Sequence, residues 1–282
     1  MRILVTGGNG YVGCHVVKKL LDLGHEVSVC DIRFDATDPR ARKLEVDIFD
    51  VTNCLYDKLG KHDVCIHLAW RNGFVHNANT QMGDLSAHYK FLTTIIDGGL
   101  KHLAVMGTMH EVGYWEGAID ESTPCNPLSQ YGIAKDALRR SIMLYCKDKD
   151  IVLQWIRGYY IYGDDQRNHS IFGKLLEAEQ NGQEKFPFTT GKTKYDFISV
   201  DELASQIAAV ISQTEICGII NCCSGKAVSL AEKIEGYIRE KNLHITLDYG
   251  KYPDRPYDSP IVYGDDTKIK QILENQRKEH NV

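Results

Sequence analysis

Two side chains at four-residue spacing, Tyr131 and Lys135, carry the clearest chemical signal in the sequence. In a helix this spacing places both on one face, one turn apart. A free tyrosine has a pKa of about 10 and exchanges its proton reluctantly near neutral pH. Because a nearby ammonium favours the phenolate, we expect Lys135 to lower the pKa of Tyr131 and to make it a general acid or base. A pair of surface side chains is the alternative interpretation.

The elements that would position this pair are a helix from about Ser129 to Cys146 and a preceding apolar strand, Leu103 to Met106. Thr108 follows that strand, and its hydroxyl can hydrogen-bond the substrate oxygen that Tyr131 would protonate. Three such groups on adjacent elements favour catalysis over a surface pair.

The first residues of the chain predict a binding site for an anion. A buried parallel strand from Ile3 to Thr6 is followed by glycines at three-residue spacing and then by an apolar helical pattern. Glycine tolerates φ > 0 and lets backbone N–H groups approach a pyrophosphate, while the helix directs its positive end at the anion. The residues of this turn that we expect to contact a dinucleotide are Gly7, Gly10, Tyr11, Val12 and Gly13.

An acidic residue follows the second expected strand, Glu26 to Cys30. Asp31 lies 18 residues after Gly13, close to the spacing of a carboxylate that binds the adenosine ribose. A helix cap or turn aspartate is the alternative. Arg33 could accept a 2′-phosphate, so Asp31 favours NAD(H) while NADP(H) stays open.

The overall composition excludes several classes of partner. The 282 residues are 43% hydrophobic and 25% charged, as in ordinary globular proteins, and the net charge of −5 argues against nucleic acid or an anionic membrane as a partner. Nine cysteines show no metal-ligand spacing, so we expect reduced thiols, no metal site and a cytoplasmic protein. Because a strand is expected from Ile3 onward, we also expect no signal peptide.

Strand and helix patterns alternate along the chain, which predicts an α/β fold with a Rossmann-type, doubly wound parallel sheet and a small α/β C-terminal substrate lobe. We expect residues 1–162 to form the dinucleotide-binding domain, 196–222 to return to it, and 163–195 with 223–282 to form the substrate-binding lobe. The further expected strands are 44–47, 63–68, 151–156, 218–222 and 244–248, and the further helices are 83–98, 169–180, 201–213, 230–240 and 267–274.

These motifs together resemble a known family. The chain is similar to the extended short-chain dehydrogenases/reductases and, more narrowly, to their nucleotide-sugar epimerase/dehydratase/reductase branch. The motifs that carry the resemblance are the glycine turn, Asp31, HLAW (67–70), Thr108, PLSQYGIAK (127–135), RGYYIYG (157–163), YDFISVDELA (195–204), INCCSG (220–225) with Ser229, and RPYD (255–258).

The resemblance implies roles for individual residues. Thr108, Tyr131 and Lys135 would be the catalytic triad, with Lys135 also holding the nicotinamide ribose. The remaining implied cofactor contacts are Asp47 and Ile48 beside the adenine, Leu68 and Ala69 along the cofactor cleft, and Tyr159 next to the nicotinamide.

Two features indicate which branch member the chain resembles most. Dehydratases of the family carry an Asp-Glu pair directly after the triad serine or threonine, whereas this chain has Met109 and His110. The GTMHEVG stretch and the tryptophan of HLAW look more like 4-keto-6-deoxyhexose reductases. The resemblance thus implies NAD(P)H-dependent reduction of the C4 ketone of a nucleotide-diphosphate 4-keto-6-deoxyhexose, in deoxysugar and cell-surface polysaccharide biosynthesis. An NAD-dependent nucleotide-sugar 4-epimerase and a non-catalytic redox sensor are the alternatives.

The substrate contacts depart from the family pattern at two positions, where Tyr160 replaces an asparagine and Tyr195 replaces an arginine. The residues that we expect to bind substrate are Arg71, Thr108, His110, Tyr160, His169 and Arg255. The resemblance also implies a homodimer built on helices 83–98 and 129–146.

Overall fold

A seven-stranded, fully parallel sheet forms the larger part of the protein in this computed structural model, which describes residues 1–52, 54–167, 170–254 and 258–280. Its strand order is β11-β7-β5-β4-β1-β2-β3, the doubly wound arrangement that the alternating pattern predicts. The strands are β1 (Arg2–Thr6), β2 (Glu26–Cys30), β3 (Arg42–Leu44), β4 (Val64–His67), β5 (His102–Thr108), β7 (Val152–Gly158) and β11 (Gly218–Cys222).

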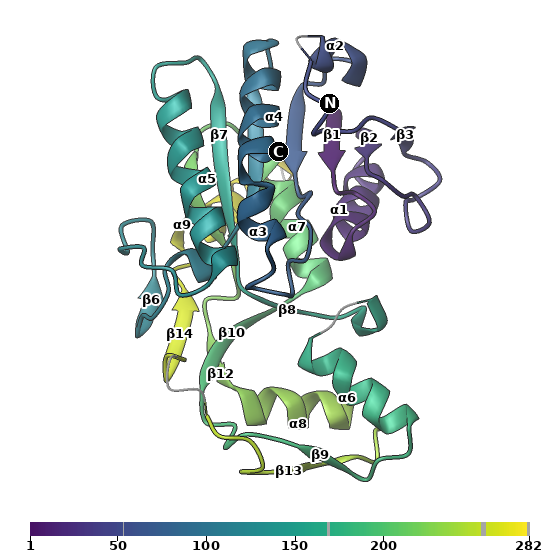
Figure 1. Cartoon of the computed structure of the whole chain (residues 1–282), viewed down its shortest axis with the longest axis vertical. Helices are drawn as coiled ribbons and strands as arrows, with labels where there is room; N and C mark the ends of the chain where they lie inside the picture. Colours follow the sequence, from purple (N-terminus) through teal and green to yellow (C-terminus); the bar gives the residue numbers. More distant parts are fainter. Residues whose placement is uncertain (53, 168–169, 255–257, 281–282) are drawn as a thin grey trace.

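Helices cover both faces of this sheet (Figure 1). One layer contains α1 (Tyr11–Asp22), α7 (Val200–Ile211) and α9 (Thr267–His280). The other contains α2 (Leu55–Leu59), α3 (Thr80–Gly83), α4 (Leu85–Asp97) and α5 (Gln130–Cys146). The catalytic pair predicted from the sequence therefore lies on a helix that packs directly beside β5.

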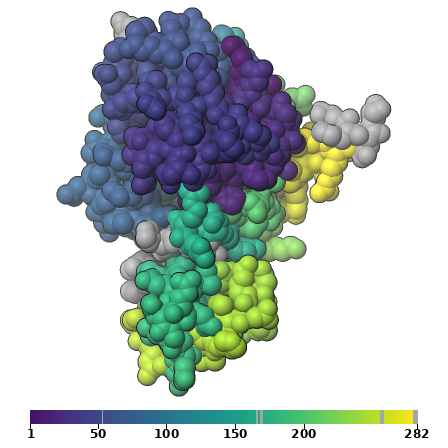
Figure 2. Space-filling view, turned by 90° about the vertical axis from the view of Figure 1, so that its right-hand side faces the viewer, coloured from purple at the N-terminus to yellow at the C-terminus, as the bar shows by residue number. Residues whose placement is uncertain are grey.

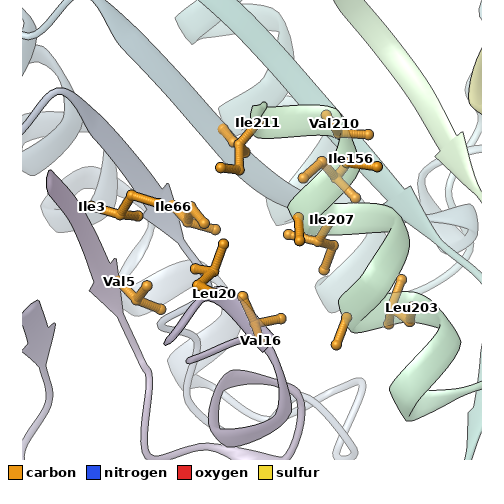
Figure 3. Packing of buried hydrophobic residues seen from close by; sticks show 14 of the residues in the cluster. Ile3, Val5, Val16, Leu20, Ile66, Ile156, Leu203, Ile207, Val210 and Ile211 are labelled. Atoms are coloured by element: carbon orange, nitrogen blue, oxygen red, sulfur yellow. The ribbon is translucent and has the colours of Figure 1, made fainter. Parts of the chain in front are cut away.

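Successive side chains of β1 explain why the strand is apolar throughout. Ile3 and Val5 point into the core beneath α1 and α7, whereas Leu4 points into the core beneath α4 and α5. Figure 3 shows Ile3 and Val5 facing the Val16 and Leu20 side chains of α1. Successive side chains of a strand point to opposite faces of the sheet, and both faces are buried when the strand is a central one in a parallel sheet.

A smaller lobe lies below the large sheet (Figures 1 and 2). Its main sheet has the order β12-β10-β14-β6, with β8 paired to β10, and a second sheet pairs β13 with β9. Its elements are β6 (Gly117–Ile119), β8 (Tyr160–Tyr162), β9 (Lys185–Pro187), β10 (Lys194–Ser199), β12 (Ala227–Ser229), β13 (Thr246–Asp248), β14 (Ile261–Gly264), α6 (Ile171–Gln180) and α8 (Leu230–Glu240). Two short 3₁₀ helices, η1 (Met109–Glu111) and η2 (Asp165–Arg167), lie near the junction of the two parts.

Several boundaries differ from the expected ones. β3 ends at Leu44 instead of Asp47, and the expected helix 83–98 is divided at Asp84, whose carboxylate pairs with Arg71. The last helix packs on α7 and β11 of the large sheet, although 223–282 was expected in the smaller lobe. β6 lies within 1–162 but pairs with β14 of the smaller lobe. The last two differences arise from contacts between segments that are distant in sequence.

Two further observations concern the whole described chain. All nine cysteines are free thiols, and Cys222 and Cys223 are both buried. Among the described residues, no helix has the length and apolar character that crossing a membrane requires.

Candidate active site

The turn between β1 and α1 is too tight for side chains at its glycines. Gly7 has φ +71°, and a Cβ on it would come 2.5 Å from the Ala69 backbone nitrogen. A Cβ on Gly13 would come 2.1 Å from the Gly7 carbonyl oxygen. The helix begins at Tyr11 with Gly10 as its cap, and its first turn carries no acidic side chain. The backbone N–H groups at this end thus suit an anion such as a pyrophosphate.

Asp31 lies beside this turn at the end of β2. Its two carboxylate oxygens accept hydrogen bonds from the backbone N–H groups of Asn9, at 2.9 Å, and Ile32, at 2.7 Å. The carboxylate is partly exposed, whereas Arg33 is fully on the surface. A fixed carboxylate at the strand end fits a ribose diol and repels a 2′-phosphate, so the residues present fit NAD(H).

The other expected cofactor contacts lie at the same edge of the sheet. Leu68 follows β4, its backbone N–H bonds the carbonyl of Thr6, and it is half-buried, as is Ile48. Asp47 is exposed and caps its own turn by accepting from the Phe49 N–H at 2.8 Å. Val12 packs against the core beneath α1, and the Tyr11 hydroxyl donates to the Gly163 carbonyl at 2.6 Å.

β5 and α5 bring the three expected catalytic side chains together. Thr108 ends β5 and is 6% exposed, and its side chain lies close enough to Tyr131 to lower the pKa of that phenol. Lys135 lies one turn further along α5 and is only 2% exposed, while the Tyr131 side chain remains partly accessible. The three groups thus converge at the carboxyl end of the sheet, where ligands bind in doubly wound folds.

The electrostatics of the pair differ from the expectation. Removal from water raises the pKa of Tyr131 above its ordinary value, and the Thr108 side chain opposes this only in part. Burial lowers the pKa of Lys135 to about 7, against the field of Glu111. The Lys135 Nζ donates to the Met106 carbonyl oxygen at 2.8 Å and lies 6.0 Å from the Tyr131 ring centroid. Lys135 therefore does not lower the pKa of Tyr131 in this arrangement, because desolvation dominates.

Sequence reasoning missed Glu111, which is fully buried directly beneath the site. Its carboxylate accepts from the Thr108 backbone N–H at 2.7 Å and from Trp155 Nε1 at 2.9 Å, and it lies 3.6 Å from the buried Arg157 guanidinium. Burial raises the pKa of Glu111, whereas Arg157 lowers it. The Thr-x-x-Glu spacing of a capping box was the signal that could have identified it.

His76 is a second residue that the sequence did not reveal. Its carbonyl accepts from the Tyr131 backbone N–H at 2.8 Å, and Asn77 Oδ1 accepts from the Gln130 N–H at 3.1 Å. The loop thereby satisfies the first N–H groups of α5, which have no partner inside the helix. The His76 ring stacks on Tyr131, with centroids 5.2 Å apart and planes 17° apart. We find no local sequence signal for this contact.

His110 and Tyr160 lie on the same side as Tyr131. The His110 ring centroid is 4.5 Å from that of His76 and 6.2 Å from those of both Tyr131 and Tyr160. Burial, with the nearby His76, lowers the pKa of His110 to about 3, so its imidazole is neutral at physiological pH. Arg71 lies apart from this group, exposed and paired with Asp84.

The remaining expected contacts are not all in the site. Tyr159 is 7% exposed and packs in the core of the smaller lobe, where a Cβ on Gly264 would come 2.8 Å from its ring. The expected contact of Tyr159 with the nicotinamide stays a prediction. Tyr195 stacks near Tyr160, with ring centroids 4.3 Å apart, and donates to Asp258. The other two expected substrate contacts, His169 and Arg255, lie outside the described residues.

One side-chain cluster has metal-ligand atoms, although no metal site was expected. Cys14, His15 and Asp164 bring three such atoms within 4.8 Å of one another. His15 Nδ1 is already bonded to Asp201 at 2.7 Å, and the Arg167 guanidinium donates to Cys14 Sγ at 3.0 Å. A cation beside the thiol opposes a bound metal ion, so we interpret this cluster as a packing junction between α1, α7 and η2.

Comparisons with known proteins identify the family of the chain. Residues 3–223 match the model of the NAD dependent epimerase/dehydratase family. The chain is 44% identical over 271 residues to dTDP-6-deoxy-L-talose 4-dehydrogenase (NAD(+)) of Aggregatibacter actinomycetemcomitans, covering 94% of this chain and 99% of that protein. It is 24% identical to UDP-glucose 4-epimerase of Lactobacillus helveticus, over 100% of this chain and 94% of that protein.

A solved structure shows the same fold. UDP-glucuronic acid 4-epimerase from Bacillus cereus, in complex with UDP-glucuronic acid and NAD, superposes with a TM-score of 0.81 at 22% identity, covering 97% of this chain and 93% of that chain. The chain therefore belongs to the NAD dependent epimerase/dehydratase family.

Proposed function

We propose that the protein interconverts the C4 hydroxyl and C4 ketone of a nucleotide-diphosphate 6-deoxyhexose with NAD(H), and that reduction of the ketone is the productive direction. The relative at 44% identity is named for oxidising dTDP-6-deoxy-L-talose at position 4 with NAD(+). Oxidation there yields a 4-keto-6-deoxyhexose, so one site serves both directions. We infer that a dTDP sugar is the substrate.

The observation that carries the proposal is the convergence of Thr108, Tyr131 and Lys135 at the end of the sheet. With its pKa raised, Tyr131 holds its proton at neutral pH and can donate it to the oxygen on C4 as negative charge develops there. Thr108 orients the same oxygen. In the oxidative direction the same step runs backwards, and the deprotonated phenol would accept the proton of the C4 hydroxyl.

The glycine turn and Asp31 would hold the pyrophosphate and the adenosine ribose, and Lys135 would hold the nicotinamide ribose. When bound, NAD(H) supplies or accepts the hydride at C4. The neutral His110 imidazole, whose ring centroid is 6.2 Å from those of Tyr131 and Tyr160, and the Tyr160 hydroxyl would contact the sugar.

A 4-epimerase is the second candidate, because several relatives and neighbours carry that name. An epimerase returns its hydride to the same sugar and does not consume added NADH. A reductase oxidises NADH in proportion to ketosugar. This difference separates the two activities in one assay.

We further propose a cytoplasmic homodimer. Apolar side chains are exposed on the outer faces of α4 and α5, where Tyr89, Ser141, Leu144 and Tyr145 line a shallow surface hollow. Leu144 is 74% exposed, which is unusual for leucine and suits a contact with a second copy.

The test is a panel of 4-keto-6-deoxyhexoses on thymidine, uridine, guanosine and cytidine diphosphates, each assayed with NADH and NADPH. We expect stoichiometric NADH oxidation, with the thymidine sugar the best substrate. Sugar interconversion with no net change in NADH would establish the epimerase instead, and the absence of any turnover would revive the redox-sensor interpretation.

A further inference from the structure

Trp70 lies directly against the candidate catalytic lysine. The Lys135 Nζ is 3.8 Å from the centroid of the indole ring, and the same Nζ donates to the Met106 carbonyl oxygen at 2.8 Å. The indole also lies edge-on to Tyr131, with ring centroids 6.2 Å apart. A lysine ammonium over the face of a tryptophan at this distance makes a cation–π contact, which is strongest away from water.

The indole is held on its other sides by buried groups. Its Nε1 donates to Gln81 Oε1 at 2.7 Å, and Gln81 is completely buried. The Gln81 amide group also donates to the carbonyls of Asn72 and Val75, which fixes the loop between β4 and α3. The position of the indole is therefore set by a closed hydrogen-bond network rather than by packing alone.

A pair of neutral histidines supports one face of the indole. The His88 ring stacks on Trp70 with centroids 4.4 Å apart and planes 11° apart. His88 Nδ1 is hydrogen-bonded to His67 Nε2 at 2.9 Å, and His67 Nδ1 to the Thr6 hydroxyl at 2.7 Å. Burial lowers the pKa of both imidazoles, so neither places a positive charge beside the ammonium.

We propose that Trp70 is a positioning residue that seats the Lys135 ammonium against the Met106 carbonyl through a cation–π contact. The proposal rests on the proposed function for the role of Lys135, but the contact itself is testable without a substrate. An ammonium has three N–H donors. One is directed to Met106, and the indole face fixes the rotation of the other two, which can then reach a ribose hydroxyl.

The charged and titratable groups around Lys135 are few, so the contribution of the indole can be isolated. They are Glu111 from η1, Tyr131 from the same helix, His67 from β4 and His88 from α4. The buried Glu111 stabilises the ammonium. Replacing Trp70 by leucine keeps the position apolar and removes none of these groups, although His88 loses its stacking partner.

The experiment measures the titration of Lys135 in the full-length protein by NMR, with lysine labelled with ¹³C at Cε and the signal assigned by its loss in Lys135→Met. We expect a midpoint near 7 in the parent protein. Trp70→Leu should lower the midpoint by about one pH unit, because the cation–π contact is lost in a dry site, and Trp70→Phe should lower it by less. An unchanged midpoint, or one that rises in Trp70→Leu because water enters, overturns the proposal.

A second measurement avoids any question of folding. The protein contains three tryptophans, and all can be replaced biosynthetically by tryptophans with one, two or three fluorine atoms on the ring. Fluorine withdraws the negative charge of the ring face with little change in shape, so the Lys135 midpoint should fall stepwise. The same series in Trp70→Leu should show no stepwise fall, which separates Trp70 from Trp155, whose Nε1 donates to Glu111. A midpoint independent of fluorine number contradicts the proposal. Because no sugar is present, failure of the proposed reaction would leave these outcomes interpretable.

If the reaction is the proposed one, kinetics give a further readout. The alkaline limb of kcat/KM for NADH should move to lower pH in Trp70→Leu, in step with the NMR midpoint. A purely structural role for Trp70 would lower activity at every pH and leave the limb in place.

Discussion

The Lys135 ammonium is directed at the carbonyl of Met106, 2.8 Å away, and not at Tyr131, whose ring centroid is 6.0 Å from Nζ. Burial raises the pKa of the tyrosine and lowers that of the lysine. A protonated phenol is the form that donates a proton to the developing oxyanion in the proposed reduction.

Replacing Tyr131 by phenylalanine removes the proposed proton donor and little else. We expect Tyr131→Phe to lower kcat by about 10²- to 10⁴-fold, since general acid catalysis contributes on that order. NADH affinity, measured by fluorescence titration, should stay nearly unchanged. Tyr114→Phe is the matched control, because Tyr114 is exposed and its hydroxyl donates to Glu116 on the surface. Parent-level turnover in Tyr131→Phe would make the mechanism wrong.

Asp31 should determine the choice between the two dinucleotides. Removing its charge in Asp31→Asn should lower the ratio of kcat/KM for NADH to that for NADPH by about tenfold, because repulsion of a 2′-phosphate is lost. Some loss with NADH is also expected, since the carboxylate fixes the Asn9 N–H of the glycine turn. Asp22→Asn, at the far end of α1, should leave the ratio unchanged. An unaltered ratio in Asp31→Asn would place the ribose elsewhere.

The buried carboxylate of Glu111 should matter for stability. Glu111→Gln keeps the shape but leaves the fully buried Arg157 guanidinium without its counter-charge. Breaking a buried ion pair on one side costs about 3 kcal/mol of unfolding free energy. Urea denaturation measures this loss, with the exposed Glu116→Gln as the control. A Glu111→Gln protein as stable as the parent would show that the pair does not stabilise the fold.

Buried histidines should make the protein sensitive to mild acid. The pKa values of His88 and His110 are lowered by burial to about 3, and that of His67 falls well below its ordinary value. An unfolded histidine titrates near about 6.5, so on acidification the unfolded state binds protons first. The stabilisation is fully present above about pH 6.5 and is lost as the pH falls toward 3.

The size of this effect can be measured by removing one of these imidazoles. Each should account for about 1.4 kcal/mol of unfolding free energy per pH unit below about pH 6. Denaturant unfolding of the parent and of His88→Gln between pH 7 and 5 measures the slope. In His88→Gln the unfolding free energy should fall less steeply with acidification, by about 1.4 kcal/mol per pH unit, because one fewer imidazole takes up a proton on unfolding. Identical slopes in the two proteins would show that His88 is already protonated in the folded protein.

The proposed dimer has a simple test. Leu144→Arg should shift the protein from dimer to monomer in light scattering after size-exclusion chromatography, because a charge would be buried in the contact. Leu23→Arg, on an exposed leucine at the end of α1, is the control and should leave the mass unchanged. A monomeric parent protein, or a dimeric Leu144→Arg, would rule out this face.

Local sequence patterns were sufficient for the large sheet and for the central chemistry. The apolar run of β1, the glycines that follow it and the acid after β2 each act through near neighbours, and the structure places them as expected. The Tyr131–Lys135 spacing works in the same way, because one helical turn fixes which face two residues share. For these features, chain connectivity and backbone geometry largely determine where the residues lie.

Tertiary structure decided what surrounds those residues. The stacking of His76 on Tyr131, the seating of Lys135 on Trp70 and the burial of Tyr159 join segments that no local pattern connects. The same holds for the pKa values of the pair, since desolvation depends on everything that excludes water from the site and not on the spacing of two residues. The sequence by itself therefore determined which groups are the candidates for the chemistry, and the packing of distant segments decided which of them holds its proton.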